Sequence, residues 1–141
     1  MGDASWKKVL LYRENTLDQF ASEEIARAQN AWTSTTASGQ PAKVEINLNY
    51  FPKYCRQMRA FYAATEQVLQ ASDQAYLKLE YADIAAGRFD KVCRFLGVDS
   101  SIGLATHLKK QNSSKSADKI SNVDEVRKWL EEAGHEDWWI E

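Results

Sequence analysis

Arg13 is the residue best placed to bind an anion. It stands between a short apolar run, Val9–Tyr12, and a helix expected to begin after Asn15. An arginine at the end of a strand lies close to the unpaired backbone N–H groups of the helix that follows, and these groups together attract phosphate or sulfate. Ser22, two turns into that helix, would add a hydroxyl. Alternatively, Arg13 pairs with a surface carboxylate such as Glu14, and Ser22 is a solvated helix residue.

Two strands and a long helical connection are expected to position these side chains. Val9–Tyr12 is apolar without alternation, which favours a strand covered on both faces, and residues 75–81 alternate as a second strand. Between them, a stripe with helical spacing is interpreted as core; its apolar members are Phe51, Tyr54, Cys55, Met58, Phe61, Tyr62, Val68 and Leu69. Strands joined by a helical crossover run parallel. The pattern therefore predicts an α/β fold with Arg13 at the carboxyl edge of a small parallel sheet, where such folds bind ligands.

The first helix carries the clearest apolar face of the chain. Asn15 and Thr16 are candidate caps, and the residues facing the core would be Leu17, Phe20, Ala21, Ile25, Ala28 and Trp32. Residues 33–40 are small and polar and indicate a loop, and residues 44–48 alternate as a short extended segment.

The second half of the chain contains two further helices and a basic loop. Residues 89–96 predict a short helix that stops at Gly97, and a last helix is expected to open at Ser121 or Asn122 and end before Gly134. Residues 106–119 predict an exposed Lys/Ser loop that includes Lys109 and Lys110. The tail at residues 138–140 is apolar enough to pack back on the body or to contact a partner.

The length, net charge, cysteines and apolar runs of the chain limit what kind of protein it can be. The length favours a single domain covering residues 1–141, and a net charge of −2 makes nucleic acid a poor partner. Cys55 and Cys93 are expected to be buried free thiols, with no metal site. Because no apolar run is long enough for a signal or a membrane span, we expect a cytoplasmic protein without membrane contact.

Several stretches in order along the chain resemble the sulfotransferases that use 3′-phosphoadenosine 5′-phosphosulfate, especially bacterial enzymes of the carbohydrate and lipid type. Residues 9–32, VLLYRENTLDQFASEEIARAQNAW, are similar to the segment that binds the nucleotide 3′-phosphate in that family. Residues 79–84, LEYADI, resemble its Tyr-Glu-Asp-Leu stretch, and residues 94–98, RFLGV, the end of its next helix. Residues 108–112 and 120–125 resemble its basic loop and last helix.

The resemblance implies a three-layer fold of the P-loop-like sulfotransferase type, in which a small parallel sheet is flanked by helices. It also implies a cofactor, 3′-phosphoadenosine 5′-phosphosulfate or its 3′,5′-bisphosphate product. Arg13 and Ser22 would bind the 3′-phosphate of that nucleotide, and Lys109 or Lys110 would close over it. The partners would be the nucleotide and a hydroxyl acceptor.

The sequence departs from the family at several points. The family's glycine-containing loop, whose lysine holds the 5′-phosphosulfate, precedes the strand expected at Val9–Tyr12, so we expect residues 1–141 to be an incomplete, truncated domain. The acceptor-side histidine has no match, since His107 and His135 are both expected at the surface, and no catalytic residue is assigned. Arg13 and Ser22 are nine positions apart where many relatives have eight, and Ala82 replaces a glutamate.

Three functions remain open from sequence. The first is sulfuryl transfer to a hydroxyl acceptor, if missing segments complete the site. The second is a non-catalytic α/β module that binds a nucleotide, an anion or a protein partner. The third, nucleic-acid binding through residues 109–119, is the least favoured because no aromatic residues are interleaved with the lysines. A sheet without its first strand would also expose an edge, which favours a homodimer unless the N-terminal residues or the tail cover that edge.

Overall fold

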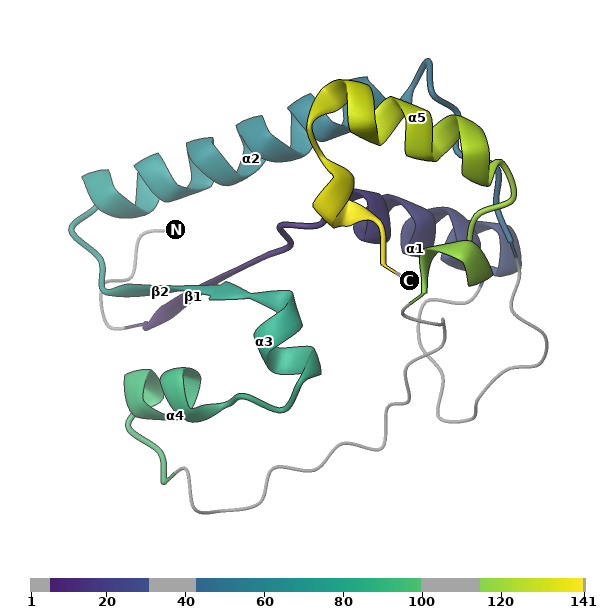
Figure 1. Ribbon diagram of the computed structural model, residues 1–141. Coiled ribbons are helices and arrows are strands. Elements are labelled where there is room, and N and C mark those ends of the chain that lie inside the picture. Colours follow the sequence, from purple (N-terminus) through teal and green to yellow (C-terminus); the bar gives the residue numbers. More distant parts are fainter. Residues whose placement is uncertain (1–5, 31–42, 100–114, 141) are drawn as a thin grey trace. The chain divides into compact units, whose positions relative to one another are not determined.

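The computed structural model describes residues 6–30, 43–99 and 115–140. The chain divides into two compact units: unit 1 is Met1–Glu14 with Gln57–Leu104, and unit 2 is Asn15–Arg56 with Ala105–Glu141. The described residues form a mixed α/β structure with a two-stranded parallel sheet and five α-helices (Figure 1).

Unit 1 contains the predicted parallel pair of strands. Strand β1 (Lys8–Tyr12) pairs with β2 (Tyr76–Glu80) in a register that runs from Lys8 opposite Tyr76 to Tyr12 opposite Glu80. Helix α2 (Phe51–Ala71) precedes β2, and its residues from Gln57 onward belong to this unit. The parallel pairing that the sequence predicts is therefore confirmed.

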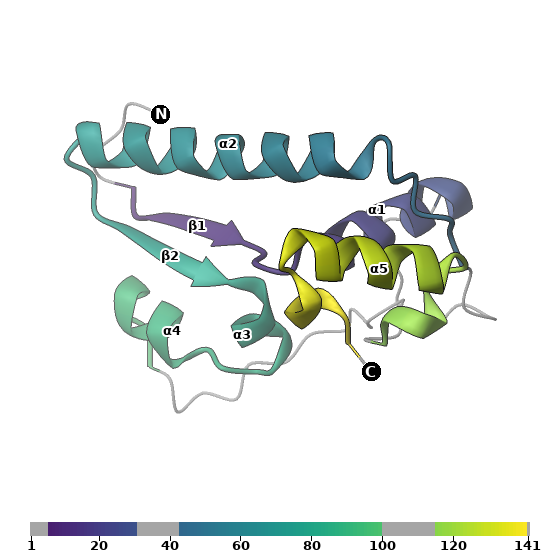
Figure 2. The same cartoon turned by 45° about the horizontal axis from the view of Figure 1, so that its top comes forward.

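Helices cover the two faces of this small sheet differently. Figure 2 shows α2 along one face and helices α3 (Tyr81–Ala85) and α4 (Asp90–Leu96) on the other side of β2. On the α2 side, the rings of Tyr12 and Tyr62 meet edge to face at 6.3 Å. On the other side, Leu79 and Cys93 are buried. Helix α4 ends at Gly97, whose φ of 78° is the left-handed conformation expected of a glycine cap.

Two sequence predictions about burial in unit 1 are wrong. Val9 and Leu11 are 41% and 48% exposed, so the strand expected to be covered on both faces is open on one. Phe61 and Val68, interpreted as members of a core stripe, are 58% and 50% exposed on α2. Since the sheet has only two strands among the described residues, it offers too little surface to cover every apolar side chain of strand and helix.

Unit 2 begins with the predicted first helix. Helix α1 (Thr16–Gln29) is capped by Asn15, whose side-chain oxygen accepts a hydrogen bond from the Asp18 backbone N–H at 2.8 Å. The residues buried along it include Leu17, Phe20, Ala21 and Ile25, as predicted. The helix ends at Gln29 with Asn30 in the left-handed conformation. Ala28 is exposed rather than core-facing, and Trp32 lies outside the described residues together with the predicted loop at 33–40.

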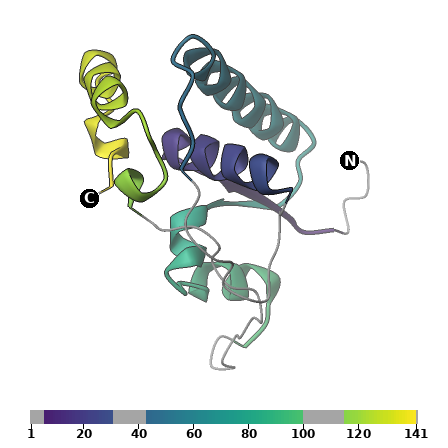
Figure 3. The ribbon, with the colours of Figure 1, turned by 90° about the vertical axis from the view of Figure 1, so that its right-hand side faces the viewer.

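An aromatic cluster forms the core of unit 2. Phe51, which is fully buried, has ring neighbours at 5.3 Å in Phe20, 5.1 Å in Trp129 and 6.5 Å in Trp138. These rings come from α1, from helix α5 (Val123–Ala133) and from the 3₁₀ helix η2 (Glu136–Trp138), which follows α5 in Figure 3. Helix α5 ends at Gly134 as predicted, with φ of 68°. The tail packs back through Trp138, one of the two outcomes expected for it.

The extended segment predicted at 44–48 is reduced to one bridge between Val44 and Ile120. Beyond that bridge, the Asn122 side chain replaces a strand partner. Its oxygen accepts from the Ile46 backbone N–H at 2.9 Å, and its amide donates to the Ile46 carbonyl at 3.0 Å. One side chain thus satisfies both backbone groups of a buried residue, which removes the need for a longer strand.

The basic loop predicted at 106–119 is described only from Lys115 onward, and there the prediction of exposure is wrong at two residues. Ser116 opens the 3₁₀ helix η1 (Ser116–Asp118) and is buried, with hydrogen bonds to Ile140 through both its N–H and its hydroxyl. Lys119 is only 2% exposed and forms an ion pair with Asp18 of α1. The sequence predicts solvent exposure here because residues 106–119 are polar and show no apolar period, and lysine is seldom buried without a partner.

Cys55 and Cys93 are thiols and not a disulfide, as predicted, although Cys55 is half-buried rather than buried. In the part of the chain that the structure describes, every helix is too short or too polar to span a membrane.

Candidate anion site

Arg13 directly follows β1 and lies at the carboxyl end of the parallel pair, as predicted. Its guanidinium carbon stands 3.8 Å from the centre of the Tyr81 ring. Tyr81 follows the last residue of β2 and opens α3. The side chain and its aromatic support therefore come from the ends of neighbouring strands, whose register fixes their separation.

Glu80 organises the backbone around Arg13. One carboxylate oxygen accepts from the Glu14 backbone N–H at 3.0 Å, and the other accepts from the Ala82 N–H at 2.9 Å. The first bond holds the chain as it leaves β1, and the second caps α3. Each oxygen of the Glu80 carboxylate already accepts a hydrogen bond from a backbone N–H. These two donors offset part of the negative charge of Glu80, which lowers its repulsion of an anion bound by Arg13.

This arrangement suits an oxyanion. A guanidinium stacked on an aromatic ring is held by cation–π attraction. Its N–H groups then point outward in a plane parallel to the ring. Those groups present a planar fork that matches two oxygens of a phosphate, sulfate or carboxylate. Replacement of Arg13 by lysine would keep the charge but lose both the stacking and the fork.

The other predicted site residues belong to unit 2 or fall outside the described residues. Ser22 is half-buried on α1 in unit 2, whereas Arg13 belongs to unit 1. Lys109 and Lys110 lie outside the described residues. The joint binding of one phosphate by Arg13 and Ser22 therefore stays a prediction, and so does the role of the two lysines.

Sequence reasoning missed Tyr81 and Glu80 as parts of this corner, although both stand in a stretch that was compared with the family. A signal was present in the pairing of the two strands. In a parallel pair, residues that end each strand lie next to each other, so Glu80 and Tyr81 belong beside Tyr12 and Arg13 once the register is known.

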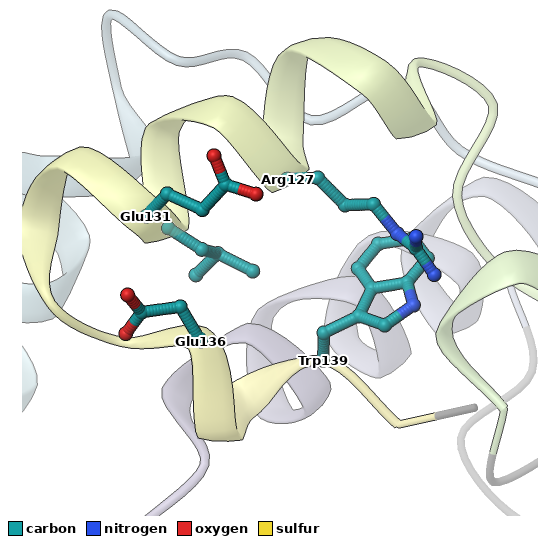
Figure 4. Close-up of a pocket in the computed structure, with 5 residues that line it drawn as sticks. Arg127, Glu131, Glu136 and Trp139 are labelled. Carbon is teal, nitrogen blue, oxygen red and sulfur yellow. The ribbon is translucent and has the colours of Figure 1, made fainter.

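A separate hollow of about 180 Å³ lies within unit 2 and is lined by Arg127, Leu130, Glu131, Glu136 and Trp139. Figure 4 shows the Arg127 guanidinium stacked on the Trp139 indole, on the other side of the hollow from the carboxylates of Glu131 and Glu136. The guanidinium carbon is 4.6 Å from the ring centre. The Trp139 indole N–H is buried and has no hydrogen-bond partner among the described residues. Sequence reasoning marked the tail as a contact surface but did not single out this hollow.

A larger polar hollow of about 530 Å³ in the same unit is lined mainly by residues 45–49 with Asn122 and Glu125. The Glu125 carboxylate accepts from the Asn122 amide at 3.2 Å, so both side chains serve the local backbone connection. Within the described ranges, no group of three or more His, Cys, Asp or Glu side chains is arranged to hold a metal ion.

Comparison with known proteins adds no identification to this geometry: no protein-family model, curated protein or solved structure matches the chain.

Proposed function

We propose that the Arg13 corner binds the 3′-phosphate of adenosine 3′,5′-bisphosphate nucleotides, and that the chain belongs to a sulfotransferase-like protein of three-layer α/β type. The observation that carries the proposal is the Arg13 guanidinium stacked on Tyr81 at the carboxyl ends of two parallel strands. The order of sequence resemblances from residue 9 to residue 125 favours this nucleotide over other anions.

The chemistry proposed for the completed protein is transfer of a sulfuryl group from 3′-phosphoadenosine 5′-phosphosulfate to a hydroxyl acceptor. Such a transfer requires positioning of donor and acceptor, cations near the bridging oxygens and a base for the hydroxyl proton. Arg13 would fix the nucleotide by its 3′ end, away from the transferring group. The residues that hold the 5′-phosphosulfate and act as base are not assigned in this chain.

A second candidate function is non-catalytic binding of a nucleotide or anion. It is favoured by the same corner, because a 3′-phosphate site alone supplies affinity but no chemistry at the sulfur. The two candidates share the binding step and differ only in turnover.

The binding step is tested by the thermal unfolding of the chain with and without adenosine 3′,5′-bisphosphate. At a nucleotide concentration of about 100 times the dissociation constant, binding to the folded state alone contributes about 2.7 kcal/mol and raises the melting temperature. Arg13→Ala should remove this shift. The matched control is Arg59→Ala, which deletes an exposed arginine on α2 and should leave the shift unchanged.

A further variant separates the nucleotide site from unspecific anion binding. Arg13→Lys keeps the charge but loses the planar fork, so it should weaken the shift given by the 3′,5′-bisphosphate and leave the smaller shift given by adenosine 5′-monophosphate unchanged. The proposal is wrong if millimolar 3′,5′-bisphosphate leaves the melting temperature unchanged, or if Arg13→Ala responds like the unmodified chain. If the chain, given the sulfated donor and an acceptor, releases the bisphosphate product, it is an enzyme; if it binds the nucleotide without releasing product, it is a binding module.

A further inference from the structure

Exposed apolar side chains gather in unit 1. Among the described residues, the large hydrophobic side chains that are exposed all belong to this unit except Tyr50: they are Trp6, Val9, Leu11, Phe61, Val68, Leu96 and Val98. Val9 and Leu11 differ from the others because they stand on a strand. Neighbours on β1 that alternate with them, such as Leu10, point to the face covered by α2.

The backbone N–H and C=O groups of Val9 and Leu11 also have no strand partner among the described residues. The Lys8 N–H donates to the Ala75 carbonyl across the sheet at 3.4 Å, so the backbone groups of Lys8 point toward β2. In a parallel ladder, alternate residues direct their N–H and C=O groups to opposite edges, and those of Val9 and Leu11 therefore point away from β2. Among the described residues, no strand pairs with this outer edge of β1.

We infer that the outer edge of β1 is a homodimer interface, at which β1 of a second copy of the chain adds in antiparallel orientation. The inference stands on the backbone and burial of β1 and is independent of the proposed function. A two-fold axis at Leu10 sets Val9 of one copy opposite Leu11 of the other. Both residues then exchange N–H and C=O groups across the edge, which satisfies the open backbone groups of both strands.

The side chains favour the same register. Residues directly opposite each other in an antiparallel pair project to the same face, so Val9 and Leu11 of both copies would form one apolar cluster. A shift by one residue would place their open backbone groups opposite groups that already bond to β2. The register is thus set by backbone and side chains together.

Charge decides between the two orientations of a second copy. Lys7 and Lys8 lie at the start of β1, whereas Glu14 follows its end and is exposed. A parallel pair would place the lysines of both copies side by side. The antiparallel pair places Lys8 of one copy diagonal to Glu14 of the other. It also sets Lys7 opposite Arg13, but the Lys7 ammonium donates to the Phe95 carbonyl of its own copy and the Arg13 guanidinium stacks on its own Tyr81 ring, so both charges are directed away from each other.

The inference is tested by the mass of the full chain in solution, measured by light scattering at concentrations up to about 1 mM, the level at which weak association is still detected. A dimer has twice the mass of the 16.1 kDa chain. Leu11→Lys places a charge in the apolar cluster and should give a monomer with an unchanged circular dichroism spectrum. The matched control, Val68→Lys, adds the same charge at an exposed site of α2 and should leave the dimer intact.

A covalent test does not depend on how well the lysine variant folds. In the inferred register, the Cα atoms of residues 9 and 11 of opposite copies are about 5.5 Å apart, a separation that a disulfide spans. The double variant Val9→Cys with Leu11→Cys should therefore oxidise to a cross-linked dimer, and Val9→Cys alone should not. A monomer at every concentration overturns the inference. So does a dimer that Val68→Lys disrupts and Leu11→Lys leaves intact, because the occupied surface would then be α2.

Discussion

Replacement of Asp18 by alanine should cost unit 2 more stability than the loss of an ordinary surface ion pair. Asp18 stands in the first turn of α1 and pairs with Lys119, whose side chain is 2% exposed. The variant leaves the Lys119 ammonium buried without this carboxylate. Breaking a buried pair by removal of one partner typically costs about 3–5 kcal/mol, whereas an exposed pair contributes under about 1 kcal/mol.

The structure places the expected loss near the lower end of that range. Asp18 retains 15% exposure, so water can reach the ammonium through the space that the carboxylate leaves. We therefore expect a loss of about 3 kcal/mol. With a urea dependence of about 2 kcal/mol per molar for a domain of this size, the midpoint of unfolding should fall by about 1.5 M.

The assay is urea unfolding followed by tryptophan fluorescence, because Trp129, Trp138 and Trp139 all lie in unit 2. Glu24→Ala is the matched control: it removes a carboxylate from the same helix, one that pairs with the largely exposed Arg27, and should cost under about 1 kcal/mol. Lys119→Met combined with Asp18→Ala should recover part of the loss. If Asp18→Ala unfolds at the same urea concentration as Glu24→Ala, the pair with Lys119 stabilises unit 2 no more than an exposed ion pair does.

Three further predictions concern the core, a titrating pair and a helix end. Phe51→Ala should cost about 3–5 kcal/mol in urea unfolding, while the exposed Phe61→Ala should cost little; equal losses would contradict the assignment of the core. The hydrogen bond from Lys78 holds the pKa of Glu66 below its usual value. The stabilisation that this pair gives the folded state is present at a pH above the usual carboxyl pKa and is lost as the pH falls through the lowered pKa of Glu66. Lys78→Met removes the hydrogen bond and should therefore raise the Glu66 pKa, which an NMR titration measures. Gly134→Ala should cost about 1 kcal/mol because its φ of 68° strains an alanine, even though a methyl group there meets no neighbour; an unchanged melting temperature would refute this.

The elements with a strong local signal were predictable from sequence. Asn15 capped α1 as expected, and the alternation around β2 predicted a strand that pairs parallel with β1. Glycines at 97 and 134 ended their helices in the left-handed conformation that local sterics require. The caps and helix ends depend on interactions within a few residues, which a pattern in the sequence records. The parallel pairing is a distant contact, but its orientation follows from the helical connection between the two strands.

Features that depend on distant partners were not predictable in the same way. From sequence alone, Lys119 is predicted to be a solvated loop residue, because its partner Asp18 lies on a helix far away in the sequence. Phe61 has the helical spacing of a core residue but faces no sheet wide enough to cover it. Arg13 was found by its position after a strand, whereas Tyr81 entered the site only through the register of the two strands.

Unit 2 is built from two segments that are far apart in the sequence, Asn15–Arg56 and Ala105–Glu141, and this affects how the protein folds during synthesis. Its first helix is bound by residues that appear at the far end of the chain: Asn15 donates to the Trp138 carbonyl, and Asp18 pairs with Lys119, 101 positions later. At roughly 5–20 residues per second, a ribosome needs roughly 5–20 seconds to make that intervening stretch. During this interval Phe20 of α1 can already contact Phe51, but the rings of Trp129 and Trp138 that complete the aromatic core of unit 2 are not yet made. The core of unit 2 can therefore close only after residue 138 has left the ribosome.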